Sequence, residues 1–471
     1  MQTHWQRAWV VLACVGLPLV AACGGESVNN PDPRLIAGGG AGDGAIKGAL
    51  HVYVIDGMSG APITGAAVRV GDSADTAPLT GTTDSAGLAS FKDGQLKGPQ
   101  TVTATAATYA ASTWVGANAA NLTIPLESTQ SPQPATAKAE GTIQGWDTRP
   151  APAAGHLLLA YIGYSYVEPF DAPENTIPQG TQDFFGVTLP TNLCAKAVIG
   201  GTERKACNWK LNTRTGKQIH WAVVIDLDTK NTTDRNDDTI TVVDYAFLLD
   251  QNLAANENKT GEVLVPVGSA GMTSATVALQ TAPTGMTAVV GLPLIKMGDS
   301  GDIALAFTPF GSSTLTQPVP ALTGVLASAT YDFIAHAKAD ANTAFPQSTI
   351  WKRGVALGST VDFGAWLPQP TSFSTTGGTY SFAPAAEASL HTVKFLQEGT
   401  SGATVAWNVG LLDGSTSFTL PALSPSPLPT GQLNLRVEAL TVPSFDAEEF
   451  EIDTLRDAAT RHSAGQLTFT R

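Results

Sequence analysis

The sequence predicts an all-β protein built of tandem β-sandwich modules that follow a cleaved N-terminal signal. Three observations predict this class. Glycine (47 of 471 residues) and proline (30) recur at short intervals, which is typical of turn-rich β proteins and unfavourable for long helices. Short segments between these turns alternate apolar and polar residues, which is the period of a half-buried strand. Hydrophobic residues make up 43% of the chain, enough for packed cores.

The charge of the chain excludes one class of partner. Charged residues are 14% of the chain, and acidic residues outnumber basic ones by 40 to 26, so the formal net charge is −14. Binding to the phosphates of nucleic acids requires an excess of lysine and arginine. Attachment to anionic lipids through a basic segment has the same requirement. The sequence therefore predicts no nucleic-acid partner, and membrane attachment has to come from another feature.

Residues 1–22 have the features of a secretory signal peptide. Arg7 supplies the positive start, and residues 8–20 form an apolar run of 13 residues. This run is too short to span a bilayer as a helix, which needs about 20 residues. The segment ends in Val20-Ala21-Ala22-Cys23, and this tetrapeptide resembles the lipobox of bacterial lipoproteins.

The resemblance to lipoproteins implies how the chain is attached. In that family the signal is removed before the cysteine, which then carries acyl chains such as palmitate, so Cys23 is the expected lipidation site. Several acyl chains anchor stably where one is marginal. In lipoproteins, an aspartate directly after the lipidated cysteine resembles a signal for retention in the inner membrane. Gly24 occupies this position here, so the resemblance implies attachment to the outer membrane, facing the periplasm or the surface. The alternative is an ordinary signal peptide cut after Ala22. Residues 23–44 are expected to form a flexible tether.

Residues 45–127 are the most clearly patterned module. Strands are expected at 50–55, 66–70, 88–91, 101–106 and 122–126, a spacing that indicates a β-sandwich. The module resembles the carboxypeptidase regulatory-like, transthyretin-related domain at Gly48, Val54, Asp56, Pro62, Ile63, Gly65, Ala66, Val68, Thr83, Asp84, Gly87, Phe91 and residues 101–109. Members of that family are not catalytic, so the resemblance implies a structural or interaction role.

The remaining chain divides by composition. We expect a linker at 128–137, a second β-rich domain at 138–299, a third β-rich region at 300–379 and a C-terminal β-sandwich at 380–471. Residues 329–340 and 453–461 are each expected to form a few helical turns, and residues 163–218 an irregular segment. The C-terminal part resembles uncharacterised lipoproteins of myxobacteria, without a sharp motif.

The two remaining cysteines of the exported chain predict a disulfide. Cys14 lies in the signal and Cys23 is assigned to lipid, which leaves Cys194 and Cys207. An even pair in an oxidising compartment is expected to be oxidised. A two-thiol metal site is the alternative, but no histidine is close in sequence.

One polar loop is a candidate calcium site. It concentrates oxygen ligands, which calcium prefers, at Asp226, Asp228, Asp234, Asn236 and Asp238. The central glycine and the final glutamate of an EF-type loop are missing, and Lys230 and Arg235 add opposing charge. The alternative is a solvated hairpin loop, and no other cofactor is expected.

Catalytic motifs are incomplete. Gly298-Asp299-Ser300-Gly301 matches the centre of a serine-protease signature, but Asp302 replaces the next glycine, and a tight turn is the alternative. The acidic run 446–453 suits either a solvated face or paired glycosidase carboxylates. The seven histidines form no metal-binding pair. Four tryptophans are candidates for either sugar stacking or core packing: Trp114, Trp146, Trp209 and Trp221.

These observations favour a non-enzymatic, lipid-anchored cell-envelope protein with a structural or binding role toward a protein or glycan partner. Two alternatives remain open. One is an exported hydrolase with its active site in residues 138–380 and accessory sandwiches. The other is an adhesion-type surface protein stiffened by calcium.

Overall fold

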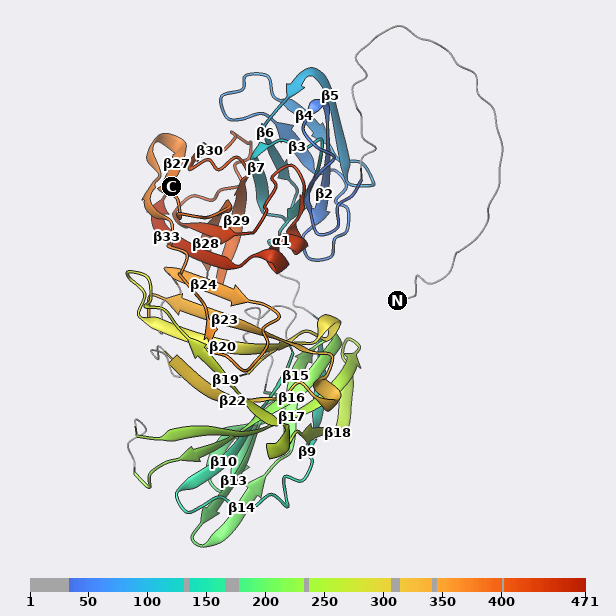
Figure 1. Cartoon of the computed structure of the whole chain (residues 1–471). Coiled ribbons are helices and arrows are strands. Elements are labelled where there is room, and N and C mark those ends of the chain that lie inside the picture. Colours follow the sequence, from blue (N-terminus) through green and yellow to red (C-terminus); the bar gives the residue numbers. More distant parts are fainter. Residues whose placement is uncertain are drawn as a thin grey trace, which may run out of the picture.

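The computed structural model describes residues 34–130, 135–165, 178–232, 237–305, 314–340, 345–399 and 402–471. These residues form 33 strands, one short helix, α1 (Ile452–Ala458), and four 3-10 turns at Ser269–Gly271, Gly298–Ser300, Gly324–Leu326 and Thr376–Gly378. The predicted all-β class is therefore confirmed (Figure 1). The predicted signal peptide and Cys23 lie outside the described residues. Among the described helices, none has the length and apolar character needed to cross a membrane.

The first sandwich packs a five-stranded sheet, in the order β32-β1-β8-β2-β5, against strands β7, β6, β3 and β4 of a 12-stranded sheet. Aliphatic side chains at alternate positions, such as Leu50, Val52 and Val54, fill the core between them, as the period of two predicts. The strands of this sandwich are β1 (Gly40–Gly42), β2 (Lys47–Asp56), β3 (Ala67–Val70), β4 (Leu79–Thr82), β5 (Leu88–Lys97), β6 (Gln100–Thr105), β7 (Ala111–Ala117), β8 (Asn121–Leu126) and β32 (Phe450–Glu451).

The tether predicted for residues 23–44 does not extend to residue 44. From Arg34 onward the chain is packed: Ile36 and Ala41 are buried, and β1 pairs with β8 on one side and with β32 on the other. The glycines that suggested flexibility instead permit close packing, because a side chain at Gly40 would collide with the carbonyl oxygen of Phe450.

The second region is an eight-stranded sheet in the order β14-β13-β10-β16-β17-β18-β9-β15, with a small hairpin beside it. Residues 178–218 are therefore largely strands, not the irregular segment expected. The predicted disulfide between Cys194 and Cys207 is confirmed. The strands are β9 (Thr136–Ile143), β10 (His156–Tyr164), β11 (Thr181–Phe184), β12 (Val187–Pro190), β13 (Leu193–Ile199), β14 (Thr202–Ala206), β15 (Trp209–Arg214), β16 (Gly216–Asp228), β17 (Thr239–Leu253) and β18 (Asn258–Pro266).

The third region packs a three-stranded sheet, β22-β19-β25, near strands β21, β20, β23 and β24 of the 12-stranded sheet. Its core also receives Trp221 and Tyr245 from β16 and β17. The helix expected at 329–340 is wrong, because these residues form β23, which is hydrogen-bonded on both sides. The strands are β19 (Met272–Ala278), β20 (Ala288–Lys296), β21 (Asp302–Ala304), β22 (Thr314–Pro320), β23 (Thr330–Lys338), β24 (Gln347–Lys352) and β25 (Val361–Asp362).

The C-terminal sandwich packs the sheet β26-β27-β30 against β33, β31, β28 and β29 of the 12-stranded sheet. Helix α1 overlaps the predicted segment 453–461, starting one residue earlier, and β33 follows it. The strands are β26 (Thr371–Ser374), β27 (Thr379–Ala383), β28 (Leu390–Gly399), β29 (Gly402–Leu411), β30 (Ser417–Thr419), β31 (Gln432–Thr441) and β33 (Arg461–Thr470).

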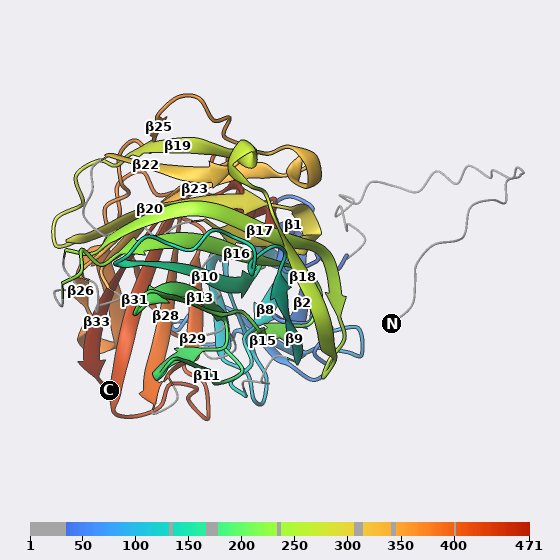
Figure 2. The same ribbon diagram turned by 90° about the horizontal axis from the view of Figure 1, so that it is seen from below.

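The 12-stranded sheet joins regions that are far apart in sequence. It runs in the order β21-β20-β23-β24-β33-β31-β28-β29-β7-β6-β3-β4. The parallel pair β29 and β7 connects the C-terminal sandwich to the first one, and the antiparallel pair β24 and β33 connects it to the third region. Viewed from below, β29, β28, β31 and β33 lie side by side, with β33 outermost in this row (Figure 2).

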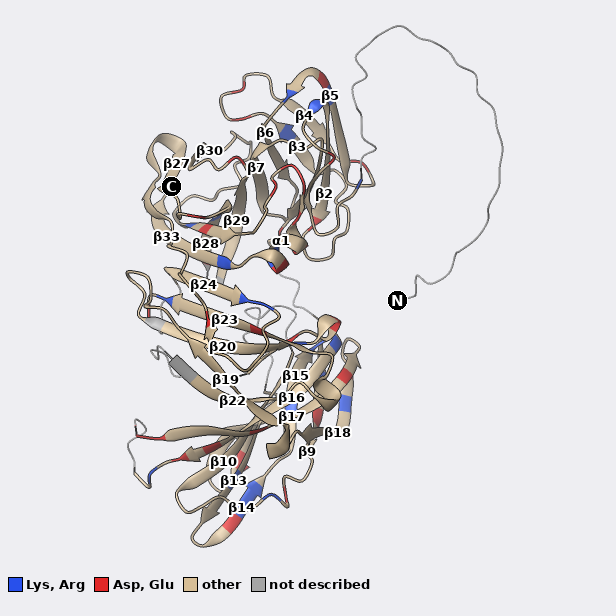
Figure 3. Ribbon diagram, in the orientation of Figure 1, with Lys and Arg blue, Asp and Glu red and all other residues tan. Residues whose placement is uncertain are grey.

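Charged residues are sparse on these strands. Most of the ribbon is neither acidic nor basic, and basic and acidic positions occur together on strands such as β14 and β18 (Figure 3). A binding site therefore has to be identified from local side-chain geometry.

Candidate binding site

Strand β33 has two halves that differ in pairing. It pairs with β31 along its whole length but with β24 only from Arg461 to Ala464. We call Arg461–Ala464 the closed half and Gly465–Thr470 the open half. Within the described residues, no hydrogen bond crosses the outer edge of the open half. Because alternate backbone groups of a strand point to each side, the open half presents unpaired N–H and C=O groups.

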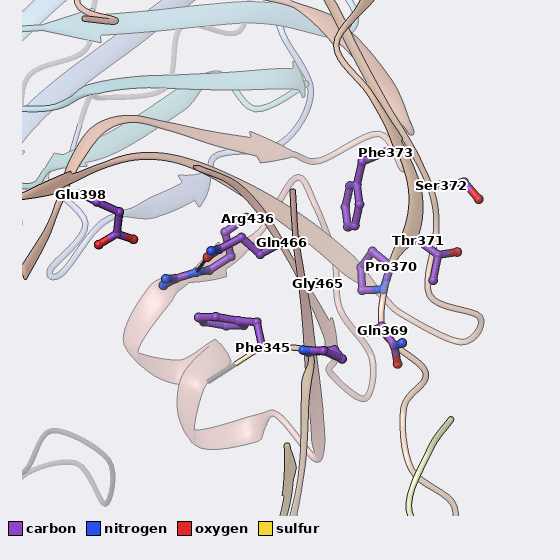
Figure 4. Close-up of a pocket in the computed structure, with 11 residues that line it drawn as sticks. Phe345, Gln369, Pro370, Thr371, Ser372, Phe373, Glu398, Arg436, Gly465 and Gln466 are labelled. Carbon is purple, nitrogen blue, oxygen red and sulfur yellow. Dashed lines mark hydrogen bonds between the residues drawn. The ribbon is translucent and has the colours of Figure 1, made fainter. Parts of the chain in front are cut away.

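A cavity of about 570 Å³ lies where the open half begins, and we call it the edge pocket (Figure 4). Its volume is within the range of about 300–1,000 Å³ that is usual for ligand sites. The pocket is lined by Phe345, Pro346, Gln369, Pro370, Thr371, Ser372, Phe373, Glu398, Arg436, Gly465 and Gln466.

The edge pocket contains side chains from both faces of the sheet. Arg436 and Gln466 are register partners on β31 and β33, so they point to the same face. Phe373 and Pro370 lie across Gly465 from them (Figure 4). A single cavity can reach both faces of a sheet only at an edge, because a neighbouring strand would divide it. The pocket therefore lies at this place because the pairing of β24 with β33 stops there.

Gly465 is required by the close approach of the opposite sheet. A Cβ at this position would lie 2.5 Å from the carbonyl oxygen of Pro370 and 2.8 Å from Cζ of Phe373. Both distances are shorter than van der Waals contact, so a larger residue would displace the wall of the pocket. The glycine therefore fixes how close Phe373 comes to the strand edge.

Arg436 is the cationic group of the pocket. Its guanidinium carbon lies 4.1 Å from the centroid of the Phe345 ring, and its Nε donates to Oε1 of Gln466 at 3.3 Å. Burial lowers the pKa of Arg436, although Glu438 and Glu398 oppose this shift. The residue still carries its charge, since arginine stays protonated in proteins. Among the described residues, no carboxylate forms a direct ion pair with it.

Glu398, the acidic residue among those that line the pocket, forms its hydrogen bond with an amide. Oε1 of Glu398 accepts a hydrogen bond from Nδ2 of Asn434 at 2.6 Å, and Oδ1 of Asn434 accepts one from Thr468 at 2.7 Å. In Figure 4 Glu398 stands apart from the rings, beyond Arg436. The arrangement is a pocket with aromatic walls, amide groups and a cation available to an incoming anion.

A different cluster lies beside the closed half. Nδ1 of His336 is 3.0 Å from Oγ1 of Thr349, and Thr349 is the register partner of His462. Burial lowers the pKa of His336 to about 4 and also lowers the pKa of His462. Burial by itself would raise the pKa of Glu438, but the nearby Lys394, His462 and Arg436 hold it below its usual value. These groups form a buried polar contact within the sheet.

A second cavity, of about 630 Å³, lies at the other end of β24 and is lined partly by Arg353 and Asp457. The Arg353 guanidinium donates to the carbonyl oxygens of Arg456 and Ala459, so this arginine secures the end of α1. It acts as a structural connection between the third region and the C-terminal sandwich.

The calcium candidates are only partly described. Oδ1 of Asp226 lies 2.9 Å from Nδ1 of His156, and Asp228 forms an ion pair with Lys230. Asp234 and Asn236 lie outside the described residues, and Asp238 lies directly before β17. Among the described residues, no group of three or more metal-binding side chains is assembled. Calcium binding at this loop remains a prediction.

The two catalytic candidates have structural roles. Residues 298–300 form a 3-10 turn before β21, and the carbonyl oxygen of Ser300 accepts hydrogen bonds from Ser165 and Arg214. In the acidic run, Glu448 accepts a hydrogen bond from Asn118. Glu449 lies 3.5 Å from Arg34. The acidic run thus contacts the first sandwich.

The four tryptophan candidates are core residues. Trp114, Trp146, Trp209 and Trp221 are all buried, so they cannot offer a face to a sugar. His220 is also fully buried beside Trp209, with Nδ1 at 2.6 Å from Oε2 of Glu262. The packing alternative is correct for these positions.

Comparisons with known proteins assign no family. No family model and no curated protein matches the chain. Similar solved structures include the Bacillus anthracis TIE protein (9% identity, 67% of this chain, TM-score 0.14) and BcpA, the major pilin subunit of Bacillus cereus (9%, 67%, 0.14). Another is the BSP domain of a biofilm-associated protein (10%, 80%, 0.11). The chain covers half the length of the TIE protein, 97% of BcpA and 85% of the BSP domain.

At these TM-scores the likenesses support no conclusion about function. The carboxypeptidase regulatory-like resemblance therefore remains a prediction.

The edge pocket has no recognisable signature in the sequence. Its residues come from the segments 345–346 and 369–373 and from three different strands. Residues 367–379 are rich in Pro, Gly, Ser and Thr, a composition that indicates only the domain boundary expected near residue 379. The expected C-terminal β-sandwich at 380–471 gave no indication that the outer edge of its last strand is free.

Proposed function

We propose that this chain is a non-enzymatic, lipid-anchored protein of the bacterial cell envelope that binds a partner through the edge pocket. One observation carries the binding role: in the part of the chain that the structure describes, the pocket opens on a strand edge without hydrogen bonds and combines aromatic walls with an arginine that forms no direct ion pair with a carboxylate. A partly buried guanidinium that forms no direct ion pair is costly for folding alone, and a ligand group that pairs with it would offset this cost.

The sheet arrangement supports a role in presentation. The first and C-terminal sandwiches share the 12-stranded sheet, and β32 of the C-terminal part adds to the first five-stranded sheet. Two independent connections restrict hinge motion between them. The lipid anchor at Cys23 would enter this unit at Arg34, whose backbone carbonyl accepts a hydrogen bond from Asn121.

Lipid anchoring is tested by replacing the cysteine. In a host that processes lipoproteins, cells are fed an alkyne analogue of palmitate and fractionated. The wild-type chain is expected to carry the label and to sediment with membranes. Cys23→Ser abolishes both, because the acyl chains have no attachment site. Cys14→Ser is the matched control and keeps both. An unlabelled wild-type chain, or membrane sedimentation of an unlabelled Cys23→Ser chain, contradicts the anchor.

A further inference from the structure

We propose that the open half of β33 is a strand-addition site, where an extended segment of a partner protein pairs with the backbone and places an acidic side chain on Arg436. This inference rests on the proposed binding role of the edge pocket and names the class of partner. It combines two features of the described residues: a strand edge that no other strand pairs with, and beside it the Arg436 guanidinium, which forms no direct ion pair with a carboxylate.

The vacant position lies in line with β24. Strand β24 begins at Gln347, which pairs with Ala464, and the preceding Pro346 has no N–H group to donate to a ladder. Beyond Ala464, β33 therefore has no neighbouring strand on that side, although it continues to pair with β31 as far as Thr470. An added segment that runs antiparallel to β33 would continue the line of β24 and satisfy the exposed backbone groups.

The side chains beside this edge specify what the segment carries. Residues of an added strand point alternately to the two faces of the sheet. On one face they meet Arg436, which lies over Phe345, so an acidic side chain there forms a charge-assisted pair. On the other face they meet Phe373 and Pro370, which favour an apolar side chain.

The same features select a peptide over other occupants. A glycan has no regular series of N–H and C=O groups, so it leaves the edge of the strand unpaired. A partner with a locally acidic extended segment satisfies the backbone edge and Arg436 together.

The experiment uses the purified full chain to select from a displayed library of random peptides about ten residues long. Selected peptides are expected to share alternating β-branched or aromatic residues with an Asp or Glu on the opposite face. Binding of the corresponding synthetic peptides is then measured by calorimetry. Arg436→Gln is expected to weaken binding by about tenfold or more, as expected for loss of a desolvated charge pair.

Two controls separate strand addition from general attraction. Arg461→Gln, on the closed half, where Arg461 already pairs with Glu387 at 2.8 Å, should leave affinity within about twofold because it removes the same charge away from the pocket. Methylation of alternate peptide nitrogens should abolish binding, since it removes the donors that pair with β33. Thermal unfolding confirms that each variant is folded, and Arg436→Lys, which keeps the charge, should retain part of the affinity.

Four results would overturn the proposal: no peptide enriched over a support without protein, equal affinity for wild type and Arg436→Gln, full affinity of the methylated peptides, or a glycan that binds in an Arg436-dependent manner. The labelling experiment on Cys23 is independent of all of them. A chain that is labelled at the membrane but selects no peptide retains its proposed envelope role and loses the strand-addition site.

Discussion

The two halves of β33 show how one strand serves both the fold and a surface. In the closed half, β24 covers the edge, Oγ of Ser463 donates to the Pro368 carbonyl at 2.8 Å, and Ile350 is buried in the adjoining core. In the open half, the same edge borders a cavity. The difference arises from where the neighbouring strand ends, and a binding edge results without any change in β33 itself.

The largest expected difference between the halves is in stability. Ile350→Ala, next to the closed half, removes buried methyl groups and should lower the free energy of unfolding by about 2–5 kcal/mol. Leu467→Ala, on the half-buried open half, should lower it by less than about 1.5 kcal/mol. Urea denaturation followed by tryptophan fluorescence measures both. Equal losses would mean that the open half is packed as tightly as the closed half.

The next largest effect on the free energy of unfolding is expected at the wall of the edge pocket. Gly465→Ala forces Pro370 and Phe373 away from the strand and should cost about 1–3 kcal/mol. Gly94→Ala is the matched control, because a Cβ there meets no atom within 4 Å, and it should be neutral within about 0.5 kcal/mol. The same denaturation experiment distinguishes them. A Gly465→Ala chain as stable as wild type would show that the opposite sheet does not press on this edge.

The smallest effect is a pH dependence of stability that arises beside the closed half. The pKa of His336 is lowered to about 4 in the folded chain, against about 6.5 in an unfolded one. Between pH 6.5 and 4 the unfolded chain binds more protons, so the free energy of unfolding falls as the pH falls. His336→Gln should reduce this loss by about 1–2 kcal/mol.

The control for the pH dependence is Gln466→Ala, on the open half. It removes no titrating group and should leave the slope of stability against pH unchanged. Thermal unfolding at several pH values measures both variants. An unaltered slope in His336→Gln would mean that this imidazole titrates normally and that the closed half is accessible to water.

The features that could be predicted are those that depend on residues close together in the sequence. Alternation at Leu50, Val52 and Val54 located β2, and the two exported cysteines located the disulfide. The helix expected at 329–340 was wrong, because buried strands such as β23 carry apolar residues on both faces and lose the period of two. The ordering of residues 34–42 also escaped prediction, since it depends on β32, about 400 positions away.

The candidate site escaped prediction for a similar physical reason. Arg436, Phe345 and Phe373 are individually unremarkable in sequence, and their proximity depends on the pairing of β24 with β33 and of β31 with β33. Register between distant strands is set by the whole core, so a free edge has no local signature. The lipobox is the opposite case, in which a tetrapeptide carries the whole hypothesis.

Hydrogen exchange of the purified full chain, read by mass spectrometry over residues 461–470, tests the central claim most directly. The account predicts slow exchange in the closed half and fast exchange at alternate amides of the open half, which become protected when a selected peptide is added. Amides of the open half that are already as protected as those of the closed half in the free chain would contradict it, because no edge would then be available to pair.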